Sequence, residues 1–480
     1  MRLPVRSIIV VFILVSVVTF WTWPQTGDTK ALQEDEEFET VLERSKTKKR
    51  KGSYRSLSSN VIKKDIDKEF ISGSDYNRLI LDHGFPDCHN RTLFNGNAGY
   101  SLPDVLKKVR EFVPPPADFV PDLKNPCWYA NYDDAKKEIN WRANYSNIIH
   151  TRQDVSHLIK NTNGKKSLYC LPYMYLLGYP KCGTTSLFDY FKKHPEFATL
   201  SSRGCGWIGT HSSGLVKDRR ANVRAMLHLV EHFYLASSQV HLSSINGNSN
   251  DMIIADFSPA SSWRQSGFEQ NMDGSMCDPP LLMKEMQPDA KFVVLIREPI
   301  SRLYSAFWFY ASTKLKEKLI KNKGPQLFTE DVHTFFDRLK RCSKDVSMLT
   351  CIRAAKDFHH HFERDDQLLT GFYHLYLLPW LQVFPRENFL FIRSEDMKED
   401  TEKALKEIFE FLEMSPLPDD VLKDTVKTVL HNQKILHSSN SNLLLSPSTK
   451  QQLRTYFRPF NEKLAELLED DKYLWEDVED

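Results

Sequence analysis

Four short, uninterrupted runs of apolar residues are spaced widely along the chain. They cover residues 173–177, 252–256, 291–296 and 389–392. Continuous runs of this length are typical of parallel strands that are buried on both faces. The segments between them carry apolar positions at helical spacing, over residues 216–237, 301–320, 329–341, 365–383 and 399–413. This alternation predicts an α/β fold in which helices flank a parallel sheet.

The two ends of the chain have different patterns. Near the C-terminus, residues 448–470 predict a helix with a break at Pro459. Near the N-terminus, residues 7–23 are apolar and carry no charge. A run of this length is at the short end for a membrane span, and a cleaved signal peptide is the competing interpretation. Trp21 and Trp23 favour an interfacial anchor over a cleavage site.

Charges on either side of the apolar run predict its orientation. Arg2 and Arg6 precede it and an acidic stretch follows it, so the positive-inside rule leaves the N-terminus in the cytosol. We therefore expect a cytosolic tail over 1–6, a transmembrane signal anchor over 7–23, a disordered stem over 24–70, a lumenal membrane-proximal segment over 71–168 and a main domain over 169–480. The formal net charge is only +1, which gives no global signal for nucleic acid.

Two acceptor sequons support a lumenal position for the bulk of the chain. Asn90 and Asn144 each begin an Asn-x-Ser/Thr sequence and are predicted glycosylation sites.

The cysteines are compatible with the same compartment. The chain has eight of them, and an oxidising lumen permits disulfides. Cys342 and Cys351 are close in sequence and are our predicted pair, and Cys88 with Cys127 is a second candidate pair. The full connectivity stays open. Cys182 is predicted to be a free, small residue.

The first candidate for chemistry is the turn GYPKCGTT at residues 178–185, which lies between a predicted strand and a predicted helix. A helix N-terminus offers free N–H groups and a favourable dipole to an anion. Lys181 adds a mobile positive charge. A triphosphate-binding P-loop fits poorly, because Thr184 stands where that motif requires lysine. An ordinary Gly/Pro turn that carries a lysine is the alternative without function.

The second candidate is KFVVLIREPISRLYSAFWFY at residues 291–310, where a predicted strand leads directly into a predicted helix. Pro299 suits the first helical turn. Arg297 at the strand end and Ser305 on the helix could together hold a second phosphate, because arginine provides a planar fork and serine a hydroxyl. An ordinary strand–helix turn with Arg297 in a structural ion pair is the alternative.

Together, PKCGTT (180–185) and R-E-P-x-x-R-x-x-S (297–305) resemble the two signature elements of sulfotransferases that use 3′-phosphoadenosine 5′-phosphosulfate. Residues 255–263, 371–397 and 456–468 add to the resemblance, which covers about 170–475. The sequence is most similar to the membrane-anchored Golgi branch that acts on carbohydrate, and within it to the N-acetylgalactosamine 4-sulfate 6-O-sulfotransferases.

The resemblance implies a sulfotransferase fold over 169–480 and transfer of a sulfuryl group from this donor to a glycan hydroxyl. The implied acceptor is an anionic chondroitin- or dermatan-type glycosaminoglycan, with the N-acetylgalactosamine 6-O position as the best guess. It also implies a Golgi location as a single-pass type II membrane protein, and a homodimer is left open. The implied donor-binding residues are Lys181, Cys182, Gly183, Thr184, Thr185, Ser186, Arg297 and Ser305. No metal is implied, and the His-rich stretch 358–363 is interpreted as a solvated helix face.

The sequence departs from the family at the general base. In Golgi carbohydrate sulfotransferases a glutamate in a Lys-Glu-Pro-His-Trp-Trp-like stretch commonly serves as base, and here Gly204 stands in its place. His211 and Asp256 are the candidate replacements, so the predicted catalytic residues are Lys181, His211 and Asp256.

Two further hypotheses therefore stay open. The first is a catalytically weak or inactive member of the fold that binds cofactor or glycan. The second is a nucleotide-dependent kinase, which the displaced lysine disfavours.

Overall fold

The computed structural model describes the part of the chain that follows the predicted stem, with gaps. The described residues are 119–130, 167–199, 204, 206–208, 229, 232–247, 250–262, 278–310, 324–342, 367–436 and 445–477. The predicted anchor (7–23), the stem, both sequon asparagines and His211 lie outside this set. Within the set, none of the helices combines the length and the apolar character that a membrane crossing would need.

The centre of the fold is a four-stranded parallel sheet. Its order is β4 (Ala255–Asp256), β3 (Met174–Gly178), β5 (Lys291–Ile296) and β6 (Phe389–Arg393), and each neighbouring pair is parallel. β3 is buried along its whole length and β5 at all but its first residue, as expected for strands covered on both faces. The predicted α/β class with a parallel sheet is confirmed.

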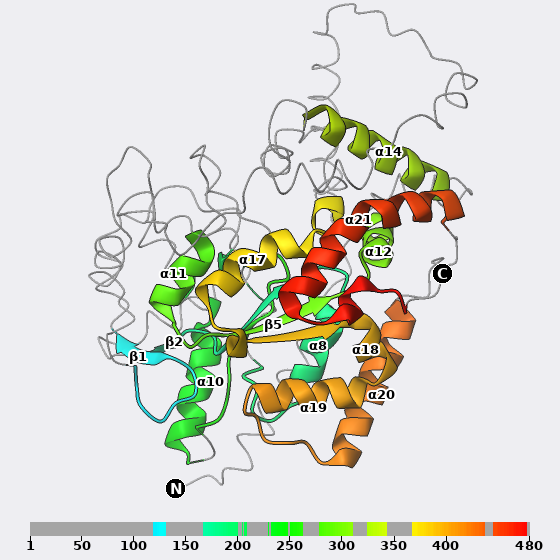
Figure 1. Cartoon of the computed structure of the whole chain (residues 1–480). Coiled ribbons are helices and arrows are strands. Elements are labelled where there is room, and N and C mark those ends of the chain that lie inside the picture. Colours follow the sequence, from blue (N-terminus) through cyan, green and yellow to red (C-terminus); the bar gives the residue numbers. More distant parts are fainter. Residues whose placement is uncertain are drawn as a thin grey trace, which may run out of the picture. The chain divides into compact units, whose positions relative to one another are not determined.

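Helices cover both faces of this sheet, and Figure 1 shows the strands passing between two groups of them. One group includes α11 (Asp278–Met286), α17 (Tyr373–Val383) and α21 (Pro447–Leu468), in which α17 contacts the other two. The other includes α8 (Thr184–Phe191), α19 (Thr401–Phe411) and α20 (Asp419–Leu436), in which α20 contacts both α8 and α19. The order of strands and helices brings the carboxyl ends of β3 and β5, and therefore both predicted motifs, to one edge of the sheet.

The structure describes four further helices and two 3₁₀ turns. They are α10 (Tyr234–Ile245), α12 (Pro299–Tyr310), α14 (Gly324–Cys342), α18 (Ser394–Glu399), and two 3₁₀ turns, η5 (Arg386–Asn388) and η6 (Asp471–Leu474). α14 confirms the helix predicted over 329–341, and α12 confirms the described part, up to Tyr310, of the helix predicted over 301–320. α11 and α20 were not predicted.

The prediction of a break at Pro459 was wrong, because α21 continues through this residue to Leu468. Proline removes one backbone hydrogen bond from a helix, but the apolar face of α21 outweighs that loss. Phe457 and Phe460 are buried on this face, and the ring of Phe460 stacks on Phe372 with 4.1 Å between centroids.

A second, antiparallel pair of strands lies outside the main sheet. β1 (Cys127–Ala130) pairs with β2 (Ser167–Cys170), and a disulfide joins Cys127 to Cys170. The candidate pairing of Cys127 with Cys88 was therefore wrong; the two strands place Cys127 directly opposite Cys170. Cys351 of the predicted pair lies outside the described residues, so that pairing stays a prediction.

Candidate functional site

The turn between β3 and α8 has the backbone geometry of an anion-binding site. Gly183 caps α8 with a φ of 89° and, as a glycine, has no side chain to accept hydrogen bonds from the first N–H groups. Among the described residues, no atom lies within 4 Å of where a Cβ on Gly183 would be, so they leave the space beside this cap open. The side chain of Thr184 is buried and that of Thr185 is exposed. The first N–H groups of α8 therefore face a free space, which suits a negatively charged group.

Lys181 lies within this turn with its side chain half-buried. Its ammonium group is 3.8 Å from the centroid of the Phe309 ring, on α12. Burial and the neighbouring Arg297 lower the pKa of Lys181 to about 8. Partial burial and repulsion from Arg297 both disfavour the charged form of Lys181. A bound anion would offset both effects, so this arrangement favours anion binding.

Arg297 follows β5 and reaches the same turn. Its Nη1 donates a hydrogen bond to the backbone oxygen of Lys181, over 3.3 Å. Among the described residues, no carboxylate forms an ion pair with either Lys181 or Arg297. The alternative of a structural ion pair for Arg297 thus finds no support in this part of the chain. Two cations from the turns after two neighbouring strands, β3 and β5, therefore converge at the N-terminus of α8, and neither has a carboxylate partner among the described residues.

The other predicted residues of the turn contribute in different ways. The thiol of Cys182 is free and buried, as predicted, and burial raises its pKa to about 11. Its N–H donates to the Tyr179 oxygen within the turn, at 3.2 Å, so this amide is already used. Ser186 is half-buried in the first turn of α8.

The start of α12 is fixed by Glu298. Its carboxylate accepts hydrogen bonds from the N–H groups of Ile300 and Ser301, at 3.0 and 2.6 Å. Ser305 is half-buried two turns into this helix. Arg302 is instead fully buried and donates to the backbone and side chain of Gln367, so it serves the core and not the open space.

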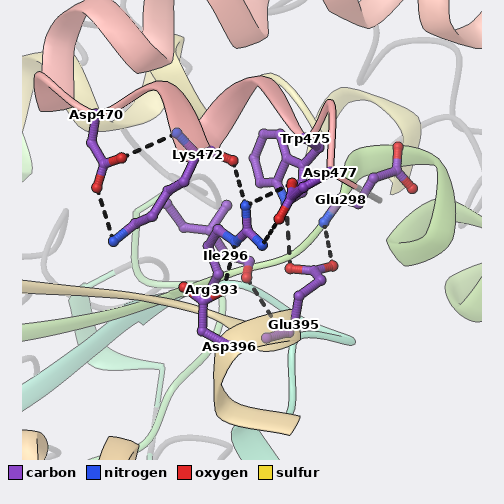
Figure 2. Close-up of polar contacts among 10 residues, drawn as sticks. Ile296, Glu298, Arg393, Glu395, Asp396, Asp470, Lys472, Trp475 and Asp477 are labelled. Carbon is purple, nitrogen blue, oxygen red and sulfur yellow. Dashed lines mark hydrogen bonds and ion pairs between the residues drawn. The ribbon is translucent and has the colours of Figure 1, made fainter. Parts of the chain in front are cut away.

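Sequence reasoning missed a network that ties both motifs to the C-terminal segment (Figure 2). Glu395, on α18, lies between Glu298 and Trp475: its Oε1 accepts from the Glu298 N–H at 3.0 Å and its Oε2 from the Trp475 indole at 3.3 Å. The hydroxyl of Ser394 donates to the backbone oxygens of Cys182 and Ile296, at 2.8 and 3.0 Å. α18 thus holds the turn after β3 and the turn after β5 in a fixed relation.

Arg393 anchors the same network at the end of β6. Its guanidinium makes a bidentate contact with Asp477 at 3.0 and 2.6 Å, donates to the Lys472 oxygen and pairs with Asp396. Bidentate arginine–carboxylate pairs are geometrically specific. The contact therefore fixes the C-terminal segment onto the sheet.

Asp256, the third predicted catalytic residue, ends β4 and is only 1% exposed. Its Oδ1 accepts from the Ser258 hydroxyl, and that hydroxyl also accepts from the Gly206 N–H at 2.8 Å. Its Oδ2 has no hydrogen-bond partner among the described residues. Burial raises the pKa of Asp256 to about 6. The carboxylate is thus buried, and the Gly206 N–H holds its partner Ser258.

Gly204 lies directly against this carboxylate. A Cβ at this position would be 2.4 Å from Asp256 Oδ1, 2.4 Å from Ser258 Oγ and 2.7 Å from Ser258 N, and the φ of Gly204 is 156°. Such distances are shorter than any van der Waals contact. The glycine that stands where related enzymes carry the glutamate is therefore required by the packing of the Asp256–Ser258 pair.

We predict that Asp256→Asn stabilises the protein at neutral pH but not at pH 4. The folded-state pKa lies above the usual value of 3.8, so folded protein binds the extra proton between about pH 4 and pH 6, and stability falls as pH rises through that window. The ionised form costs at most about 3 kcal/mol, since one pKa unit is about 1.4 kcal/mol. Urea unfolding at pH 4 and pH 7 measures the difference. The exposed Asp289→Asn is the control, and an equal effect of Asp256→Asn at both pH values would contradict the prediction.

A metal centre finds no support in the described ranges, because these contain no group of three His, Cys, Asp or Glu side chains that could hold an ion. The His-rich stretch 358–363 is outside those ranges, as is His211.

Comparison with known proteins identifies the family. The model of the sulfotransferase domain matches residues 172–463. Carbohydrate sulfotransferase 15 from Homo sapiens is 30% identical over 409 residues, which is 78% of this chain and 69% of the human protein, and the Mus musculus protein of the same name is 29% identical over the same shares. A membrane-associated sulfotransferase, kil1, from Dictyostelium discoideum is 22% identical over 64% of this chain and 67% of its own.

Among solved structures, a sulfotransferase from Alicyclobacillus acidocaldarius aligns with 62% of this chain and 96% of its own, at 17% identity and a TM-score of 0.37. The family assignment does not depend on this solved structure. It rests on the domain model, which matches more than half of the chain, and on the mammalian relatives. The chain belongs to the sulfotransferase family and is of the carbohydrate sulfotransferase 15 type.

Proposed function

We propose that the protein transfers a sulfuryl group from 3′-phosphoadenosine 5′-phosphosulfate to a hydroxyl group of a glycan. The observation that carries the proposal is the convergence of Lys181 and Arg297, two cations without a carboxylate partner among the described residues, at the open N-terminus of α8. The family supplies the class of reaction, and the names of the relatives supply the class of acceptor.

The residues of the site fit the proposed sulfuryl donor. The N–H groups of Gly183, Thr184 and Thr185 would hold the 5′-phosphate in the space that the missing Cβ of Gly183 leaves open. Arg297 and Ser305 would hold the 3′-phosphate, since a guanidinium fork and a hydroxyl both donate to phosphate oxygens. Cys182 supports the turn through packing and its bond to Tyr179.

Lys181 has the central role in this proposal. Negative charge develops on the leaving phosphate as a sulfuryl group departs, and a fixed cation at that oxygen stabilises it. The turn also orients the reacting groups, which is a large part of catalysis by group transfer. No step of this account requires a metal.

The proposed acceptor is a chondroitin- or dermatan-type glycosaminoglycan, sulfated at the 6-O position of N-acetylgalactosamine. Basic residues suit such an anionic polymer. The candidates that the sequence offers are Arg203, Lys217, Arg219 and Arg220, all outside the described residues.

Asp256 is the proposed general base among the described residues. With a pKa of about 6 it is ionised at neutral pH yet basic enough to accept a proton. To reach an acceptor hydroxyl it requires a movement of Gly204 and Gly206, because Gly204 lies against the carboxylate and Gly206 is bonded to its partner Ser258 in this structure. His211 remains the other candidate.

The second candidate function is a member of the fold that binds the sulfuryl donor but transfers poorly. The observation that favours it is the burial of Asp256, which is 1% exposed, next to a glycine at the position of the usual base.

We also propose a Golgi membrane location, with residues 7–23 as the signal anchor and the sulfotransferase domain in the lumen. The disulfide between Cys127 and Cys170 supports an oxidising compartment, and the sequons at Asn90 and Asn144 are compatible with it.

A transfer assay with an acceptor panel tests the function. The full chain is incubated with donor carrying labelled sulfate and with chondroitin, dermatan or heparan chains, without added metal, and the products are digested to disaccharides. We expect label on chondroitin or dermatan, at the 6-O position of N-acetylgalactosamine. Label confined to heparan would contradict the proposed acceptor, and absence of label from every chain would contradict sulfuryl transfer and favour the member of the fold that binds but transfers poorly.

Glu395→Gln is predicted to weaken binding of adenosine 3′,5′-bisphosphate by about threefold to tenfold, because a lost hydrogen bond to a charged group costs about 1 kcal/mol or more. A glutamine has one acceptor oxygen, so it cannot serve both the Glu298 N–H and the Trp475 indole. The turn that carries Arg297 then loses a support. Calorimetric titration measures the affinity, with the exposed Glu399→Gln on the same helix as control. Equal affinities of the two variants would refute this role.

A further inference from the structure

Phe309 is an exposed aromatic residue at the edge of the site. It lies near the end of α12, four residues after Ser305, so the two share one face of the helix. Its side chain is 56% exposed. A large apolar side chain at this exposure contributes little to the core, and Phe309 lies outside the two signature elements at 180–185 and 297–305.

The ring of Phe309 has a defined contact with the site. The Lys181 ammonium is 3.8 Å from the centroid of the ring, well within the range in which a cation is attracted to an aromatic face. Repulsion from Arg297 and partial burial both disfavour the charged lysine. A lysine side chain has four rotatable bonds, so without an attractive partner it would turn away from Arg297 into solvent.

We propose that Phe309 is a positioning residue for Lys181: the face of its ring holds the charged ammonium over the turn, beside Arg297 and in front of α8. The inference rests on the proposed function, because it gives Lys181 its role toward the sulfuryl donor. In this account the ring makes no contact with reacting atoms. It reduces the freedom of the lysine before the anion arrives, and this raises affinity.

A double-mutant cycle on the full chain tests the proposal, with calorimetric affinity for adenosine 3′,5′-bisphosphate as the measurement. Phe309→Leu keeps an apolar side chain but removes the aromatic face, and we expect the affinity to fall by about threefold to tenfold, the range of one cation–π contact. Phe309→Trp keeps the face and should retain the affinity. In a Lys181→Ala background, Phe309→Leu should have no further effect. The control is Tyr129→Leu, which removes another exposed ring, on β1.

The pH dependence of binding gives a second readout that a merely structural role would not change. The groups that face the Lys181 ammonium are Arg297, from the end of β5, and the Cys182 thiol of its own turn. The ring favours the charged lysine, so Phe309→Leu should move the alkaline loss of binding to lower pH, while Phe309→Trp should leave it in place.

Three results would overturn the inference. Unchanged affinity of Phe309→Leu would show that the ring does not position the lysine, while the proposed function stands. The same loss in the Lys181→Ala background would show an effect that does not act through Lys181. Absence of binding by the wild-type chain would contradict the proposed function itself, and the inference with it.

Discussion

Lys181→Ala is expected to lower kcat/KM for sulfate transfer by about a hundredfold to a thousandfold, the usual effect of removing one group that stabilises developing charge. The Lys181 ammonium lies over the turn against the Phe309 ring, whereas Arg297 is tied to the backbone of the same turn by its hydrogen bond to the Lys181 oxygen. Arg297 therefore cannot replace the ammonium at the bridging oxygen. Initial rates over a range of concentrations of sulfuryl donor measure the effect.

Lys192→Ala is the matched control for this variant. Lys192 follows α8, also lies near an aromatic ring at 5.2 Å from the Phe188 centroid, and pairs with Asp189. The substitution removes the same charge from the other end of the same helix. If Lys181→Ala kept more than a tenth of the wild-type value, or if both variants lost activity equally, the role assigned to Lys181 would be wrong.

Gly204→Glu, which places the glutamate of related sulfotransferases at this position, is expected to destabilise the fold by about 3 kcal/mol or more and to bring no gain in activity. The new Cβ would lie 2.4 Å from both Asp256 Oδ1 and Ser258 Oγ, and overpacking of a tight site typically costs about 1–3 kcal/mol. Backbone strain at this φ and the proximity of two carboxylates add to that cost. Urea unfolding measures the stability.

Gly247→Glu separates the clash from the backbone strain. Gly247 has a φ of 67°, and a Cβ there would meet no atom of the described residues within 4 Å, so we expect this variant to have only the cost of the left-handed conformation, about 1–2 kcal/mol. A Gly204→Glu protein that is as stable as Gly247→Glu, and faster than wild type, would contradict the packing described for Asp256 and Ser258.

The sheet could be predicted from the sequence where burial alone determines a strand. Residues 291–296 form β5 as predicted, because apolar side chains are covered on both faces of the sheet. The run at 252–256 was predicted to be a full strand, yet only Ala255 and Asp256 pair with β3. Ile253 instead forms an isolated bridge with Phe197. An apolar pattern reports burial and does not report which neighbour supplies the hydrogen bonds.

The residues of the candidate site likewise differ in how far the sequence could predict them. Lys181, Gly183 and Arg297 belong to local motifs, and their residue types and spacing indicated an anion site. Glu395 and Trp475 could not be found in this way, because each acts through a contact with a residue about 80 to 97 positions away. Gly204 is a third case. The sequence showed that a glycine replaces the glutamate common in the family, but only the packing around Asp256 explains why a larger residue does not fit there.

The donor site can be measured without an acceptor and without turnover, by calorimetric titration of adenosine 3′,5′-bisphosphate into the full wild-type chain and into Lys181→Ala and Arg297→Ala. We expect one site per chain in the wild type, without added metal, and an affinity at least tenfold weaker in each variant. Absence of binding, or equal binding by all three proteins, would contradict the assignment of the β3–α8 turn and Arg297 as the site of the sulfuryl donor.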